Sequence, residues 1–141
     1  MKLPRLLALV LGSFTLLAAA CGGGGDSKAT VQGFFDAFND RDADKIYDSF
    51  SSSCLQGITK DQFNQGWALG ASFIGDSKAK IESIDVKEDG DNASATVKGK
   101  FEGGPLDGAD AQEDTLDLKK EDGKWKIADC SFIQGLTGPG G

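Results

Sequence analysis

Apolar residues early in the chain recur at the spacing of an α-helix. Over residues 28–39 they fall at positions i, i+3, i+4 and i+7, and polar residues take the opposite side. The apolar stripe consists of Val31, Phe34, Phe35 and Phe38. This pattern predicts an amphipathic helix that buries one face.

Two more helices are predicted before residue 75. Asp42 precedes the second one, where its carboxylate can accept hydrogen bonds from the free N–H groups of the first turn. The buried side of this helix consists of Ile46, Tyr47 and Phe50. Thr59, with Gln62 three residues later, has the sequence of a capping box, which predicts a third helix that ends near residue 73. Gly66 and Gly70 on that helix indicate a closely packed face or a bend.

After Gly75 the apolar residues alternate with polar ones, which predicts β-strands. Inward positions on four successive strands are Ile84 and Val86, then Ala95, Val97, Gly99 and Phe101, then Leu116 and Leu118, then Trp125 and Ile127. The last strand is expected to reach residue 132, with a bulge near Ala128 where the alternation changes phase. The predicted fold class is therefore α+β, with three N-terminal helices packed on a curved antiparallel four-stranded sheet.

The N-terminal residues have the features of an export signal. Lys2 and Arg5 precede an apolar run of about 12 residues, which is shorter than the roughly 20 that a spanning helix needs. The predicted organisation is a signal peptide over residues 1–20, a lipidated glycine-rich tether over 21–27, one domain over 28–134 and a flexible tail over 135–141.

The small residues before Cys21, followed by four glycines, resemble the lipobox of bacterial lipoproteins. The position three residues before Cys21 is Ala18, where that family most often has leucine. The resemblance implies that Cys21 becomes the N-terminus and carries acyl chains such as palmitate. The expected location is the extracytoplasmic side of a bacterial cell membrane, with a lipid anchor. An ordinary signal peptide with a coincidental cysteine is the alternative.

Composition and charge exclude several function classes. The 141 residues include 15 Lys or Arg, 22 Asp or Glu and no histidine, so the formal net charge is −7. Without imidazole, catalysis by Ser-His or Cys-His pairs and His-ligated metal sites are excluded. Removal of Lys2 and Arg5 with the signal peptide changes the charge to 13 − 22 = −9. Such an acidic chain repels phosphate backbones, so we expect no nucleic-acid partner.

Two stretches resemble the nuclear-transport-factor-2-like, or cystatin-like, superfamily. They are residues 34–47, with the sequence FFDAFNDRDADKIY, and residues 122–127, with the sequence DGKWKI. Within the superfamily the chain is most similar to small bacterial lipoproteins of unknown function. The resemblance implies a cone-shaped sheet and leaves the activity open, because this fold is used by enzymes, binding proteins and scaffolds.

Cys54 and Cys130 remain after lipidation of Cys21, in a chain expected in an oxidising compartment. A disulfide between them is predicted, with two buried thiols as the alternative. We expect no metal and no cofactor. The alternating aspartates at positions 40, 42 and 44 lack the rest of a calcium loop and suit helix capping. The acidic stretch over residues 103–114 is interpreted as a solvated loop, with a weak cation site or a partner contact as the alternative.

The inward positions of the predicted strands contain no group that transfers a proton, so we expect a protein without enzymatic activity. An apolar pocket is predicted around Tyr47, Trp67, Phe73 and Trp125, unless these aromatic residues simply fill the core. Its ligand would be a small apolar molecule or a protein of the cell envelope. The alternatives are an enzyme of the isomerase or dehydratase type with a pocket around Tyr47, and a structural lipoprotein with a filled core. A homodimer through the outer sheet face is expected to use Thr96, Lys98, Lys100, Asp117 and Lys119.

Overall fold

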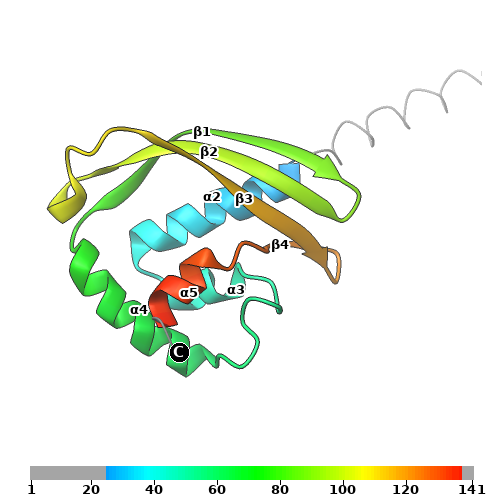
Figure 1. Ribbon diagram of the computed structural model, residues 1–141, viewed down its shortest axis with the longest axis horizontal. Helices are drawn as coiled ribbons and strands as arrows, with labels where there is room; N and C mark the ends of the chain where they lie inside the picture. The colour runs from blue at the N-terminus through cyan, green and yellow to red at the C-terminus, as the bar shows by residue number, and fades with distance from the viewer. Residues whose placement is uncertain (1–24, 138–141) are drawn as a thin grey trace, which may run out of the picture.

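The computed structural model describes residues 25–137 (Figure 1). Its elements follow in the order α2 (Gly25–Asp40), α3 (Ala43–Asp48), α4 (Lys60–Ile74), β1 (Lys78–Asp89), β2 (Asn92–Glu102), the short 3-10 helix η1 (Gly104–Leu106), β3 (Gln112–Glu121), β4 (Lys124–Ile127) and α5 (Ser131–Thr137). The predicted signal peptide and Cys21 lie outside these residues. The predicted α+β fold class is confirmed.

The four strands form one antiparallel sheet in the order β1-β2-β3-β4, so each strand pairs with its neighbour in sequence. The register of β1 against β2 shifts between Ile81 and Ser83, which leaves Glu82 as an extra residue. A bulge of this kind increases the local bend and twist of a long hairpin. The curved sheet arches over α2, with α3, α4 and α5 gathered below (Figure 1).

The predicted helix starts are confirmed by their caps. The carboxylate of Asp42 accepts a hydrogen bond from the N–H of Lys45 at the start of α3. At the start of α4, the Thr59 hydroxyl accepts from the N–H of Gln62, whose side chain accepts from the N–H of Thr59 in return. These bonds satisfy N–H groups that have no partner within the helix.

The structure corrects the boundary between tether and domain. Helix α2 begins at Gly25, three residues earlier than predicted, so the end of the 21–27 tether belongs to the folded part. Ser27 is fully buried, and its hydroxyl donates a 2.6 Å hydrogen bond to the Glu88 carboxylate near the end of β1. A contact between residues so far apart in sequence leaves no trace in local composition.

The C-terminal prediction needs a larger correction. Strand β4 ends at Ile127 and the chain then forms α5, so the change of phase near Ala128 marks the end of a strand and not a bulge. The predicted tail over residues 135–141 begins inside this helix. Leu136 of α5 packs against α4, where a Cβ added to Gly70 would lie 3.0 Å from Leu136 Cδ2. The prediction that Gly66 and Gly70 form a closely packed face is therefore confirmed.

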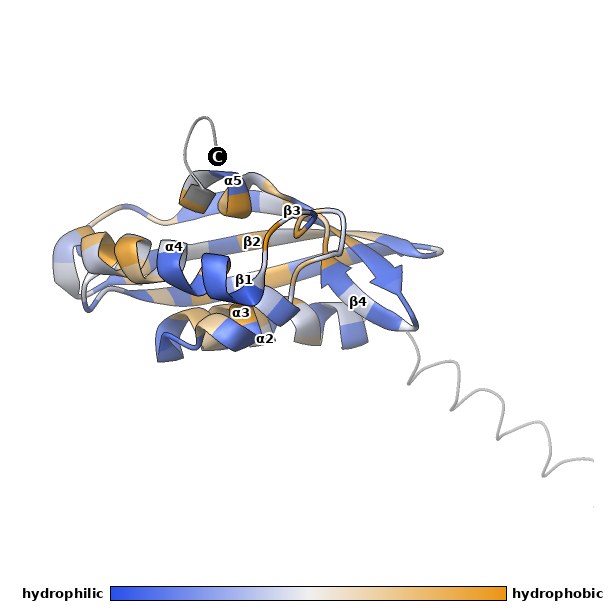
Figure 2. Ribbon diagram, turned by 90° about the horizontal axis from the view of Figure 1, so that it is seen from below, coloured by the Kyte–Doolittle hydropathy of each residue, from blue (hydrophilic) through white to orange (hydrophobic). Residues whose placement is uncertain are grey.

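The buried apolar residues form two clusters. The larger one, here called the helical cluster, joins α2, α3, α4 and α5 to the end of β4. Its buried members are Phe34, Ala37, Phe38, Ile46, Phe50, Cys54, Phe63, Trp67, Ala79, Ile127 and Ile133. The second, here called the sheet cluster, packs the start of α2 on the sheet through Val31, Ile84, Ala93, Ala95, Val97, Leu118 and Trp125. Figure 2 shows the alternating hydrophilic and hydrophobic bands of the strands that supply these residues.

Candidate functional site

The four aromatic residues of the predicted pocket do not surround one cavity. Trp67 is buried in the helical cluster and Trp125 in the sheet cluster. The Tyr47 hydroxyl donates a 2.8 Å hydrogen bond to the carbonyl of Ile58. Phe73 is 79% exposed, because it lies off the buried stripe of α4. The pocket prediction is therefore wrong as a group of residues, and these rings are core or surface residues.

A cavity of about 230 Å³ instead lies between α2 and the concave face of the sheet. Phe35 of α2 forms one wall. The facing strands contribute mainly apolar side chains, namely Ile81, Val97, Phe101 and Leu116. Three of these four residues stand at the inward strand positions predicted from the alternation, and Ile81 precedes the bulge that shifts the pattern. The inward face of the sheet was thus predicted correctly, whereas the four aromatic residues predicted for the pocket do not line this cavity.

The middle of this cavity wall is Gly99, which lies opposite Ile81 on β1. A Cβ added to Gly99 would lie 2.7 Å from the carbonyl oxygen of Lys80, a distance that real Cβ atoms do not adopt. The close approach of β1 beside its bulge therefore requires glycine here. Because glycine presents no side chain to the concave face, the same requirement helps to keep the cavity open.

One ionisable residue on the concave face was not predicted from the sequence. Asp114 was assigned to the acidic loop over residues 103–114, but β3 begins at Gln112 and Asp114 pairs with Val97. It shares the inward phase of Leu116 and Leu118, and it lines the 230 Å³ cavity. Counting back in twos from those leucines would have placed it correctly.

Asp114 also lines a second cavity, of about 270 Å³, beside the aromatic residues of α2 and α5. Asp129 lines the same cavity, together with the rings of Phe34, Phe50 and Phe132. Asp114 Oδ1 accepts a 2.9 Å bond from the N–H of Thr115, and Asp129 Oδ1 accepts a 3.0 Å bond from the N–H of Ser131. Both carboxylates are thus positioned by their own backbone neighbours.

The rest of the predicted acidic loop is held by Ser77. The buried Ser77 hydroxyl donates to the carbonyl of Gly103 at 2.8 Å and accepts from the N–H of Leu106 at 3.0 Å. The Asp107 carboxylate accepts from the N–H of Gly103. Within residues 25–137, no group of three or more acidic or cysteine side chains is arranged to hold a metal ion.

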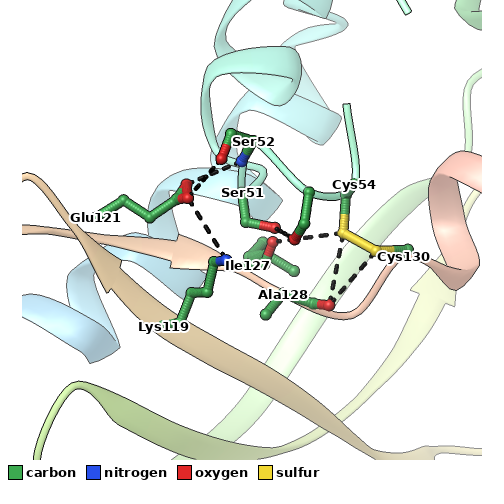
Figure 3. A network of polar contacts seen from close by, with 9 residues as sticks. Ser51, Ser52, Cys54, Lys119, Glu121, Ile127, Ala128 and Cys130 are labelled. Atoms are coloured by element: carbon green, nitrogen blue, oxygen red, sulfur yellow. Dashed lines mark hydrogen bonds and ion pairs between the residues drawn. A yellow bond between two sulfur atoms is a disulfide. The ribbon is translucent and has the colours of Figure 1, made fainter. Parts of the chain in front are cut away.

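The predicted disulfide between Cys54 and Cys130 is present, with a Cα–Cα distance of 5.1 Å. It joins the segment after α3 to the segment that leads into α5 (Figure 3). Ser51 reinforces this junction, because its N–H donates a 2.8 Å hydrogen bond to the carbonyl of Ile127. The bridge therefore fixes the side of the domain that holds the helical cluster.

The carboxylate of Glu121 lies at the same junction and has a lowered pKa. Glu121 Oε1 accepts a 2.8 Å bond from the N–H of Ser52, and Oε2 accepts a 2.7 Å bond from its hydroxyl (Figure 3). These bonds, with a smaller contribution from Lys119, lower the pKa of Glu121. The hydrogen bond from Lys60 to Asp48 raises the pKa of Lys60. Neither pair lines either of the two cavities.

Comparison with known proteins connects this architecture to a fold. No protein-family model and no curated protein sequence matches the chain. A candidate ketosteroid isomerase from Shewanella frigidimarina matches with a TM-score of 0.60 and 18% identity, over 76% of this chain and 94% of that one. A cystatin-like protein of unknown function from Nostoc punctiforme matches with a TM-score of 0.58 and 14% identity, over 72% and 83%. A candidate dehydratase of the nuclear-transport-factor-2-like family from Streptomyces avermitilis matches with a TM-score of 0.54 and 16% identity, over 72% and 88%.

At these identities the comparisons show the fold alone. The chain has the nuclear-transport-factor-2-like, or cystatin-like, fold, and the resemblance seen in the sequence is confirmed at that level. Among its structural neighbours, one is described as a candidate isomerase, one as a candidate dehydratase and one as a protein of unknown function. None of the helices between residues 25 and 137 combines the length and hydropathy of a membrane-spanning segment.

Proposed function

We propose that this protein is a lipid-anchored extracytoplasmic binding module that holds a small apolar molecule between α2 and the sheet. The observation that supports this most directly is the cavity walled by Phe35, Val97, Phe101 and Leu116. Ligand sites in proteins are concave, mostly apolar and equipped with a few polar groups at defined positions. The volume of about 230 Å³ is just below the usual lower limit of roughly 300 Å³, so the ligand is small.

Binding without turnover fits the chemistry of the cavity. Tyr47 does not line it, and its hydroxyl is already bonded to the carbonyl of Ile58. Asp114 is exposed to solvent, so it is not enclosed in a water-excluded site of the kind in which a closed active site holds its reacting groups. The proposed role is therefore to bind or carry a molecule rather than to convert it.

An enzyme of the isomerase or dehydratase type is the second candidate, and Asp114 is the observation that favours it. Its carboxylate lies on the concave face, and two structural neighbours are described as a candidate ketosteroid isomerase and a candidate dehydratase. Turnover of a bound molecule that is abolished in Asp114→Asn, with binding retained, would establish this role. Unchanged product formation in Asp114→Asn would exclude it.

The ligand site is tested with a matched pair of substitutions in the chain from Gly22 onward, which contains both clusters and the disulfide. Leu116→Trp fills the cavity, whereas Leu69→Trp places the same ring on the outside of α4, where Leu69 is 70% exposed. Calorimetric titration with phenylbutanol, a neutral apolar probe, is expected to give binding to wild type and Leu69→Trp and at least tenfold weaker binding to Leu116→Trp. Equal affinity in all three proteins would contradict the proposed site.

The anchor is tested in cells. We expect the full chain to incorporate an alkyne analogue of palmitate and to sediment with membranes, and we expect Cys21→Ser to lose the label. Two or more acyl chains give stable anchoring, since each buried CH₂ contributes about 0.8 kcal/mol. Labelling that persists in Cys21→Ser would exclude Cys21 as the acylated residue.

A partner at the outer sheet face, either an envelope protein or a second copy of the chain, is sought in a separate experiment by cross-linking at Lys98.

A further inference from the structure

Three carboxylates lie where the two cavities meet the solvent. Asp114 lines both cavities, Asp110 lines the one beneath the sheet, and Asp129 lines the one beside the aromatic residues. The other carboxylate oxygen of each residue, Oδ2 of Asp114 and Oδ2 of Asp129, accepts no hydrogen bond from residues 25–137. These groups are therefore available to a ligand.

One basic side chain lies near these carboxylates, and it is paired with another residue. Lys100 is the basic residue on the wall of the 230 Å³ cavity, and its ammonium pairs with Glu102 at 3.7 Å. The wall of the 270 Å³ cavity contains neither lysine nor arginine. In the described part of the chain, no ion pair involves Asp110, Asp114 or Asp129. The negative charge at the cavity junction is thus left for an external cation.

Aromatic rings surround the same junction. Phe132 stacks on Phe50 with ring centroids 5.8 Å apart and meets Phe34 edge-on at 5.5 Å. All three rings line the 270 Å³ cavity with Asp114 and Asp129. Aromatic faces attract ammonium groups, and the attraction strengthens where the site is partly desolvated. The combination of carboxylates and rings favours an organic ammonium over a small hydrated metal ion.

We propose that the ligand is an amphipathic amine whose apolar body occupies the cavity beneath the sheet, with its ammonium group at Asp114 facing Asp129 and the phenylalanine rings. This inference rests on the proposed ligand site and adds the charge of the ligand. The net charge of −9 expected for the processed chain attracts such a molecule over longer distances as well.

The test uses three probes with one apolar body and different charges: phenylbutylamine, phenylbutanol and phenylbutyrate. Calorimetry on wild type at low salt is expected to rank the amine first and the carboxylate last, with the amine about three- to tenfold tighter than the alcohol. Asp114→Asn is expected to remove this preference, so that the amine and the alcohol bind with similar affinity. Asp85→Asn, the same charge change on the opposite face of the sheet, is the matched control and should retain it.

The outcomes separate the two proposals. Equal binding of all three probes would overturn the charge inference and leave the apolar site intact, and tighter binding of the carboxylate would overturn it as well. Binding of no probe would overturn the apolar site, and the amine proposal with it. A preference for the amine that is equal in wild type and Asp114→Asn would place the cation elsewhere and contradict the position proposed for the ammonium group.

Discussion

The two halves of this small domain handle their apolar surface in opposite ways. The helical cluster fills the space between four helices with packed aromatic rings, such as those of Phe38 and Trp67, whose centroids lie 5.6 Å apart. The Cys54–Cys130 disulfide links two segments at its edge. Along β1, β2 and the start of β3, the same kind of side chain lines an open cavity instead. One half thus supplies stability and the other supplies a concave surface.

The difference comes from what covers each half. Helices α3, α4 and α5 all pack onto the helical cluster, whereas the cavity is covered by Phe35 of α2 and by the loop that contains Ala109 and Asp110. Buried side chains of the covered half such as Phe63 and Trp67 line neither cavity, so their removal leaves voids. Side chains at the cavity already border empty space, so their removal has a smaller effect on folding and a larger one on binding.

The largest effect on stability is expected from removing the disulfide in the covered half. Replacing Cys54 and Cys130 together with serine should lower the free energy of unfolding by roughly 4 to 5 kcal/mol, since the bridge closes a loop over a sequence separation of 76. Urea unfolding followed by tryptophan fluorescence measures this change. Wild type treated with a reducing agent should give the same midpoint, and a loss below about 1 kcal/mol would show that the bridge does not stabilise this half.

A matched pair of phenylalanine substitutions tests the comparison directly. Phe63 is 3% exposed in the helical cluster, so Phe63→Ala should cost about 3 to 4 kcal/mol of unfolding free energy. Phe35 is half-buried at the cavity, so Phe35→Ala should cost about 1 to 2 kcal/mol. The same urea experiment measures both. If Phe35→Ala were as costly as Phe63→Ala, the cavity side would be as tightly packed as the helical cluster.

The smallest effect is expected at Glu121, whose side chain is 23% exposed beside the covered half. Its pKa is lowered in the folded chain by the hydrogen bonds from Ser52, so the resulting stability is present above the ordinary value of 4.5 and is lost as pH falls through the folded value. Glu121→Gln should therefore reduce stability at neutral pH by at most about 1 kcal/mol and flatten its decline in acid. Unfolding midpoints measured across this pH range check the slope. Parallel curves for the two proteins would contradict the assignment.

Local rules predicted most of the fold. The stripe of α2, the caps at Asp42 and Thr59, the alternating strands and the glycine face of α4 each depend on residues close together in sequence. The pairing of Cys54 with Cys130 followed from counting the available thiols in a chain expected to be exported. These features needed no knowledge of how the elements meet.

The errors concern features decided by distant contacts. The stretch that leads to Asp114 has the composition of a loop and becomes a strand only because β2 pairs with it. Helix α5 was missed, with its first residues predicted as the end of a strand and its last ones as a flexible tail, because the contact of Leu136 with Gly66 and Gly70 on α4 cannot be seen locally. The observed cavity has other lining residues than the predicted pocket for the same reason, since the cavity depends on which residues face each other across the sheet.

The proposed ligand site between α2 and the sheet is tested most directly by amide chemical-shift mapping of phenylbutanol on the chain from Gly22 onward. A ligand between α2 and the sheet should produce shifts at Phe35, Val97 and Leu116 and leave the signals of Ile46 and Phe63 in the helical cluster unchanged. Shifts confined to the exposed Leu69 and Phe73 of α4 would contradict the proposed site, because they would place binding on the outer surface of α4.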